Sequence, residues 1–141
     1  TPYLAFYLAW VGAAAFGGAT YDVTSHYRAA AVFAFHEQQG LTPYRLRAIS
    51  QQQVGLLRGE FERLDVAPSL AYVEPMPDER RGGFLAIRAA AAKDIAHRLR
   101  ERGVHVDARG DILRMGPAPY LRDDQLRDAI GAVGEALGSR L

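Results

Sequence analysis

The fold of this 141-residue chain is constrained most by one stretch near its C-terminus, RGVHVDARGDILRMGPAPY. Val104 and Val106 alternate with polar neighbours, which is typical of a half-buried strand. The pair Gly110-Asp111 favours a tight reversal, and the apolar run that starts at Ile112 is short enough for a second strand. Gly-Pro-Ala-Pro then ends this strand, because proline has no N–H to give to a sheet. The stretch therefore predicts two strands joined by a tight turn.

Arg114 lies inside the second of these predicted strands, just before the Gly-Pro break. One interpretation is an Arg on an edge strand that faces solvent or forms an ion pair. The other is a guanidinium aimed into a site, where it holds a carboxylate in a bidentate fork. The spacing alone favours the first interpretation and leaves the second open.

The rest of the chain predicts an α+β fold. Thr42-Pro43 is a clear helix start, with Thr as the N-cap and Pro at the first helical position. The first predicted helix is expected to bury one face, made of Tyr27, Ala30, Ala31, Ala34 and Phe35. Hydrophobic spacing and turn signals predict helices at 22–39, 42–64, 89–102 and 122–138, and further strands at 69–74 and 82–88. We expect a small, mostly antiparallel sheet of about four strands covered by helices.

Composition excludes several classes of function. The 17 basic and 16 acidic residues leave a net charge of +1, which gives no argument for a nucleic-acid partner. The chain has no Cys, so no disulfide or thiolate site is expected, and the cytoplasm is the default location. None of the four His residues has a neighbour at zinc-binding spacing, so we predict no metal site. Asp123 and Asp124 are expected to cap the last helix rather than to form a catalytic dyad.

The N-terminal segment raises the question of a membrane. Residues 1–21 carry no charge, and residues 3–16 are strongly apolar. Glycines interrupt the apolar run and no basic cluster flanks it, so we predict a buried strand with its following loop rather than a membrane span. The chain starts with Thr-Pro and not with Met, and we expect it to be a piece of a longer protein.

The run RGV…D.R..DILR.G.AP.Y resembles the C-terminal end of kynureninases, which are fold-type I pyridoxal-phosphate (PLP) enzymes of the aminotransferase class V group. This resemblance implies that Arg114 binds the α-carboxylate of an amino-acid substrate. It makes Arg109 a second candidate, either as a substrate-binding residue or as a support that pairs with Asp107 or Asp111. Arg81 resembles the family's Arg-Gly step into the sheet, although a solvated loop is the simpler interpretation.

A second point of resemblance is the segment FGGATYD, where Gly18 and Thr20 match the family's phosphate-binding step ahead of a long helix. The resemblance implies that Thr20 reaches the cofactor phosphate of the partner subunit in a homodimer. A hydroxyl beside the N–H groups at a helix start suits that role physically. Helix capping by Thr20 is an equally good interpretation.

One departure from the family bears on catalysis. PLP enzymes hold the cofactor through a Lys, and the chain's single Lys, Lys93, is not in the expected context. We therefore expect no catalytic residue in this chain. Residues 1–21 would end a large PLP domain, and residues 22–141 would form the C-terminal small domain.

The full-length reaction implied by the resemblance is hydrolysis of kynurenine to anthranilate and alanine. A class V aminotransferase or epimerase of another substrate stays open. A third possibility, from another class, is a non-catalytic α+β binding or regulatory module. Cysteine desulfurases are disfavoured, because the connection from Asp107 to Ile112 is short and the chain has no Cys.

Overall fold

The computed structural model describes residues 24–138, and the chain divides into two compact units, Thr1–Thr42 and Pro43–Leu141. The predictions for residues 1–21, including the apolar segment and the end of a large domain, lie outside the described residues. Among the described residues, no helix is long and apolar enough to cross a membrane.

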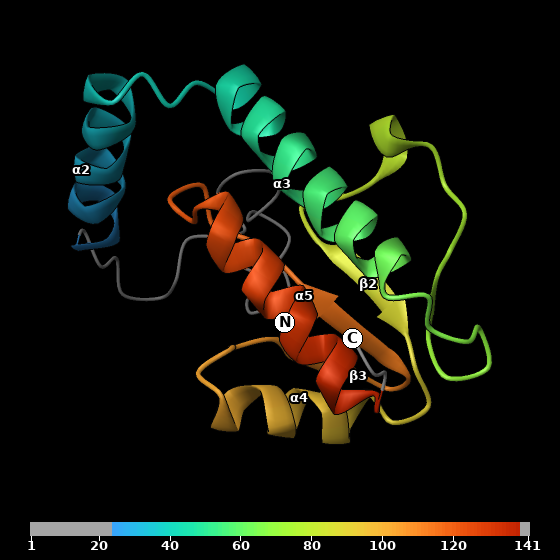
Figure 1. The fold of residues 1–141 in the computed structure, drawn as a ribbon. Coiled ribbons are helices and arrows are strands. Elements are labelled where there is room, and N and C mark those ends of the chain that lie inside the picture. The colour runs from blue at the N-terminus through green and yellow to red at the C-terminus, as the bar shows by residue number, and fades with distance from the viewer. Residues whose placement is uncertain (1–23, 139–141) are drawn as a thin grey trace, which may run out of the picture. The chain divides into compact units, whose positions relative to one another are not determined.

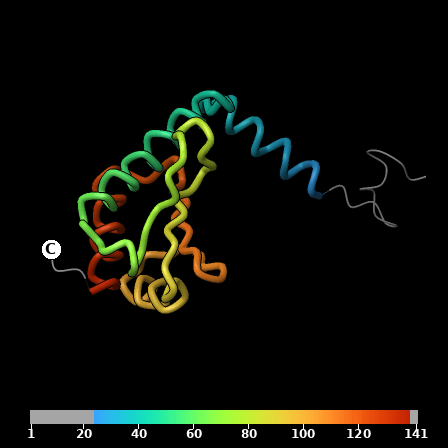
Figure 2. The backbone as a smooth tube through the Cα atoms, turned by 90° about the vertical axis from the view of Figure 1, so that its right-hand side faces the viewer, coloured from blue at the N-terminus to red at the C-terminus, as the bar shows by residue number. Residues whose placement is uncertain are grey.

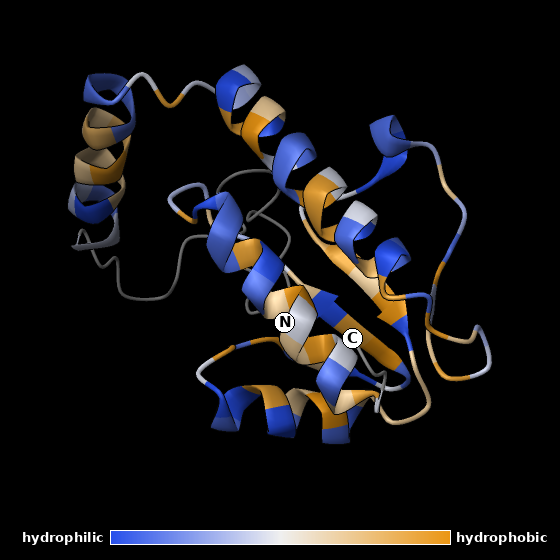
Figure 3. Ribbon diagram, viewed as in Figure 1, coloured by the Kyte–Doolittle hydropathy of each residue, from blue (hydrophilic) through white to orange (hydrophobic). Residues whose placement is uncertain are grey.

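In the first unit, the described residues form the helix α2 (Thr24–Gln38), which agrees with the predicted helix (Figure 1). Two residues beyond its end lies Gly40, whose φ of 61° is a left-handed conformation that glycine adopts without strain. The prediction of a buried inner face is wrong for this chain, because no residue of α2 is buried. Residues 29–35, in the middle of the helix, are all apolar, and Phe33 and Phe35 are both exposed, so no single face is marked for burial (Figure 3).

The second unit contains three helices, four strands and one short 3-10 turn among its described residues. In chain order they are α3 (Pro43–Arg63), β1 (Tyr72–Val73), η2 (Asp78–Arg80), β2 (Leu85–Arg88), α4 (Ala92–Glu101), β3 (Asp107–Arg109), β4 (Ile112–Met115) and α5 (Asp123–Ala136). This is the predicted order of elements.

The four strands form one antiparallel sheet in the order β1-β2-β4-β3. The β3–β4 hairpin turns through Gly110 and Asp111, with Arg109 paired to Ile112 and Gly110 at a φ of 60°. The prediction of an α+β fold with a small antiparallel sheet is confirmed.

Three strand boundaries differ from the prediction, and one of them is the start of β2, which lies at Leu85 and not at residue 82. β1 is short because residues 67–71 form a turn, in which the N–H of Leu70 donates to the carbonyl of Ala67 at 2.8 Å. The first strand of the hairpin begins at Asp107, and Val104 and Val106 precede it as half-buried residues. The register of the hairpin explains why β3 begins later than predicted. Asp107 pairs with Arg114, and β4 ends one residue after Arg114, so little of β4 is left for residues before Asp107 to pair with.

One face of the sheet carries the hydrophobic core. Leu85 and Ile87 on β2 and Leu113 and Met115 on β4 alternate with less buried neighbours, as strands with one covered face do. The three helices α3, α4 and α5 contribute the other buried apolar side chains except Ala71 and Ala89, which lie in connecting segments. In Figure 2, α3 and α5 lie on the same side of the strands. Gly134 on α5 leaves room for the side chain of Leu64, the first residue after α3, since a Cβ there would lie 3.0 Å from Leu64 Cδ2.

A buried glutamine ties α3 to the loop that follows β4. Gln53 is 2% exposed, and its amide nitrogen donates to the carbonyls of Ala118 at 3.0 Å and Leu121 at 3.2 Å. From the sequence, Gln53 is a polar interruption in the apolar stripe of its helix. The structure shows that it fixes the Pro-rich segment just beyond Arg114.

We predict that Gln53→Leu, a change of similar size, lowers the free energy of unfolding of this domain by about 1–3 kcal/mol, because two partly buried carbonyls lose their donor. Urea unfolding of the full-length protein measures the change. Gln52→Leu is the matched control on the same helix, where an exposed side chain should change stability by less than about 0.5 kcal/mol. Equal effects of the two substitutions would contradict the structural role of Gln53.

Candidate functional site

Among the described residues of the second unit, the helices α3, α4 and α5 all pack against the core face of the sheet, and the second face carries the charged residues of the strands. Arg114 on β4 lies between Ala86 on β2 and Asp107 on β3, its partners in the antiparallel register. Because side chains alternate along a strand, Arg114 points away from the core that Leu113 and Met115 enter. Arg114, the residue predicted to bind a carboxylate, therefore lies on the second face of the sheet, which we call the open face.

The guanidinium of Arg114 is held from two directions. Its Nη2 donates to Oδ2 of Asp107, directly across the hairpin. Its Cζ lies 5.3 Å from the centre of the Phe84 ring, within the range of a cation–π contact. The side chain is 27% exposed, yet its Nε is buried and donates no hydrogen bond within the described part of the chain.

Asp107 is shared by two arginines. Besides Arg114, the Nε of Arg109 donates to the same Oδ2 of Asp107 at 3.3 Å. The hydrogen bond from Arg114, followed by the charges of both arginines, holds the pKa of the Asp107 carboxyl below its ordinary value. At neutral pH, Asp107 is therefore an anion between two cations.

A shallow hollow of about 390 Å³ opens over this group. Its lining residues come from the start of β2, from the hairpin and from the residues that flank it: Phe84, His105, Val106, Asp107, Arg114 and Gly116. Phe84 and His105 were not expected from the sequence as site residues. The pairing of Leu85 with Met115 could have indicated Phe84, because it places the preceding aromatic residue near the end of β4.

The other arginines of this face are already paired. Arg88 binds Glu74 and Asp111, each at 2.9 Å, and these two hydrogen bonds raise its pKa. Arg81 is only 12% exposed and holds its own loop, donating to Asp78 at 3.2 Å and to the carbonyls of Glu74 and Met76. The loop interpretation of Arg81 therefore fits the structure better than an anion site.

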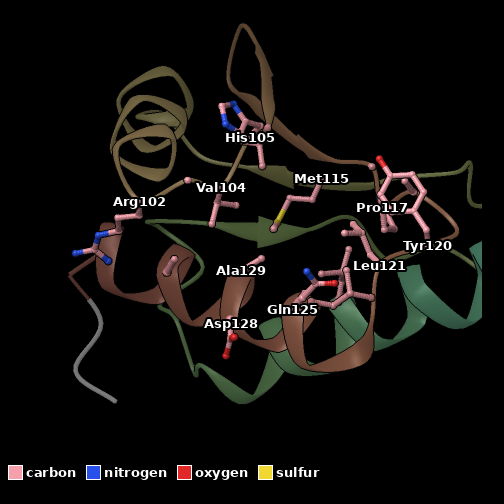
Figure 4. A pocket seen from close by; sticks show the side chains of 17 residues that line it. Arg102, Val104, His105, Met115, Pro117, Tyr120, Leu121, Gln125, Asp128 and Ala129 are labelled. Atoms are coloured by element: carbon pink, nitrogen blue, oxygen red, sulfur yellow. The ribbon is translucent and has the colours of Figure 1, made fainter.

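A larger hollow, of about 620 Å³, does not contain Arg114. It lies between α5, residues 102–106 and the loop after β4, and it is lined mainly by apolar side chains such as Val104, Met115 and Ala129 (Figure 4). Size alone would favour this hollow as the binding site. We place the candidate site at Arg114 instead, since the smaller hollow holds the cation that can bind a carboxylate.

The remaining candidates are placed as follows. Gly18 and Thr20 lie outside the described residues, so their phosphate-binding role stays a prediction. Lys93 is exposed on α4, which packs against the core face of the sheet, opposite to the face of Arg114. The prediction that Asp123 and Asp124 cap the last helix is wrong, because Arg122 is the N-cap of α5. The two aspartates are in its first turn, where their charge suits the helix dipole, and Asp124 pairs with Arg122 at 2.7 Å. Among the described residues, no three His, Asp or Glu side chains gather as metal ligands.

A comparison with protein families matches residues 46–133 to the kynureninase C-terminal domain. The matched range covers more than half of the chain and includes Phe84, Asp107, Arg109 and Arg114. The chain belongs to the kynureninase C-terminal domain family. It is thus the C-terminal part of a kynureninase-like, fold-type I PLP enzyme. A comparison with curated proteins gives no match.

Solved structures support the same fold. One is an adenosylmethionine-8-amino-7-oxononanoate aminotransferase from Methanocaldococcus jannaschii, with a TM-score of 0.65 and 17% identity over 89% of this chain and 30% of that chain. Another is a lysine aminotransferase from M. tuberculosis in its internal aldimine form, with a TM-score of 0.60 and 25% identity over 79% of this chain and 25% of that chain. The chain spans less than a third of the length of these enzymes.

We predict that Lys93→Ala in the full-length protein leaves the visible absorbance of bound PLP unchanged, because Lys93 lies on the helix that covers the opposite face of the sheet. The measurement is an absorbance spectrum after excess PLP has been removed. Loss of the cofactor band in this variant would contradict the assignment of the cofactor Lys to a part of the protein outside this chain.

Proposed function

We propose that this domain supplies the substrate-carboxylate site of a kynureninase-like PLP enzyme, with Arg114 as the carboxylate ligand. The observation that supports this most directly is the position of the guanidinium, on the open face of the sheet beneath a hollow, in a side chain that is 27% exposed. A planar guanidinium gives two parallel N–H bonds to a carboxylate, which a Lys cannot do.

Within the proposed domain layout, residues 1–21 end the large domain and residues 22–141 form the small domain. The described residues fit substrate binding better than cofactor binding, because the chain's single Lys lies on α4, which packs against the face of the sheet opposite to Arg114. Family membership implies PLP in the full-length protein, and we assign its Lys to the large domain. A homodimer in the cytoplasm, with Gly18 and Thr20 near the cofactor phosphate of the partner, stays a prediction.

The proposed reaction is hydrolysis of kynurenine to anthranilate and alanine. PLP, when bound, supplies the electron sink for this chemistry. The contribution of Arg114 is to fix the α-carboxylate, so that the rest of the substrate is held in one orientation toward the reacting atoms. Phe84 restricts the guanidinium on one side and thereby limits the directions from which a carboxylate can approach.

An aminotransferase of another amino acid is the second candidate. The similar structures named above are aminotransferases by their descriptions, which favours this candidate. Both reactions need a carboxylate ligand, so Arg114 has the same role in each. The family match to the kynureninase domain favours hydrolysis. It also favours an enzyme domain over a non-catalytic module.

We predict that the full-length protein with PLP releases anthranilate and alanine from L-kynurenine with no added 2-oxo acid. Anthranilate fluorescence follows the release directly. Amino-group transfer that depends on a 2-oxo acid, without anthranilate, would replace hydrolysis by the aminotransferase alternative. Neither activity with a range of amino acids would favour the binding module.

We predict that Arg114→Lys in the full-length enzyme lowers kcat/KM about 30- to 1000-fold, which corresponds to about 2–4 kcal/mol of lost transition-state binding. The charge is kept and the bidentate fork is lost. PLP content should stay near that of the parent enzyme, because Arg114 is assigned to the substrate. Steady-state kinetics with cofactor content measured in parallel provides the test.

Arg88→Lys is the matched control for Arg114→Lys, since Arg88 lies on the same face and is occupied by Glu74 and Asp111. Its kcat/KM should stay within about twofold of the parent value. Arg109→Lys should be less harmful than Arg114→Lys. A larger effect at Arg109 would move the carboxylate role to that residue, and no effect at either residue would contradict the proposed site.

A further inference from the structure

Asp107 occupies the part of Arg114 that an incoming carboxylate has to reach. The Nε of Arg114 is buried, and Phe84 lies against the guanidinium. The accessible part is therefore the Nη end, and Asp107 accepts from Nη2 there. A substrate carboxylate bound to the Nη end of Arg114 would lie next to the Asp107 carboxylate. Two negative charges bound to one guanidinium repel each other.

Asp107 has a second cation within reach. Arg109 already donates to the same oxygen of Asp107 at 3.3 Å, and its side chain is 73% exposed. The Asp107 side chain is half exposed, so rotation away from Arg114 meets little packing. After such a rotation, Asp107 would keep one ion pair and would not become an unpaired anion.

We propose that Asp107 is an internal competitor for the carboxylate site. Asp107 pairs with Arg114 in the substrate-free enzyme, and it moves to Arg109 when the substrate carboxylate binds to Arg114. This inference rests on the proposed role of Arg114. It gives Arg109 a positioning role, exerted through Asp107, in place of direct contact with the substrate. The affinity of Arg114 for the substrate carboxylate then depends on how much more strongly Arg114 binds that carboxylate than it binds Asp107.

The test uses L-alanine and ethylamine, two ligands that differ only in the carboxylate. Dissociation constants come from titration of the absorbance of bound PLP in the full-length enzyme, so turnover is not needed. We expect Asp107→Asn and Asp107→Ala to bind L-alanine about two- to fivefold more tightly, the range that release of an exposed ion pair supports. Binding of ethylamine should not change. Asp111→Asn, an exposed carboxylate on the same hairpin that pairs with Arg88, is the matched control and should leave both constants unchanged.

Arg109→Gln tests the transfer. It should weaken L-alanine binding in the parent enzyme and have no effect in the Asp107→Asn background, because Arg109 acts only through Asp107. An effect that persists in the double variant would show direct contact between Arg109 and the carboxylate, and would overturn the positioning role. Weaker or unchanged L-alanine binding in both Asp107 variants would overturn the competition and leave Asp107 as a support for Arg114.

Arg114→Lys separates this inference from the proposed function. If Arg114→Lys does not weaken L-alanine binding, the carboxylate site itself is misplaced, and the proposed role of Arg114 fails. If Arg114→Lys weakens L-alanine binding but the Asp107 variants do not strengthen it, only the competition fails. A gain in affinity for ethylamine equal to that for L-alanine would also overturn the inference, since the effect would then not involve the carboxylate.

Discussion

The register of the β3–β4 hairpin is the constraint on which the rest of this domain depends. A two-residue turn through Gly110 and Asp111 pairs Arg109 with Ile112 and Asp107 with Arg114. A shift of one residue would turn Leu113 and Met115 out of the core and Arg114 into it. That exchange would bury a charge and expose two large apolar side chains. The position of Arg114 on the open face is thus fixed by the same hydrophobic burial that holds the sheet to its helices.

Much of this arrangement follows from the sequence. The turn at Gly110-Asp111 and the break at Gly116-Pro117 bound β4, and counting outward from the turn places Asp107 opposite Arg114. The order of helices and strands also follows, because apolar spacing and helix starts such as Thr42-Pro43 are local signals. The contact between Asp107 and Arg114 follows from the same count, although Asp107 was expected only as a partner of Arg109.

Other features depend on contacts between distant parts of the chain, and a local pattern does not contain them. Gln53 is a polar residue in an apolar stripe of its helix. Its role as a hydrogen-bond donor depends on the loop after β4, which places two carbonyls within its reach. The approach of Phe84 to Arg114 requires the pairing of β2 with β4, which are separated by α4 in the sequence. The helix α2 is the opposite case, in which a local pattern predicts a contact that the structure does not contain. Its apolar residues predict burial, and no residue of that helix is buried in this chain.

The structure divides the work of a carboxylate site between a rigid part and a movable part. The backbone of Arg114 is on a central strand, paired on both sides, with Leu113 and Met115 fully packed next to it. Its guanidinium therefore starts from a fixed point, as a preorganised site requires. Asp107 and Arg109 are on the edge strand, where their side chains are half or more exposed and can change partners at little cost. A site built in this way keeps its cation in place and leaves only exposed groups to rearrange when a carboxylate arrives.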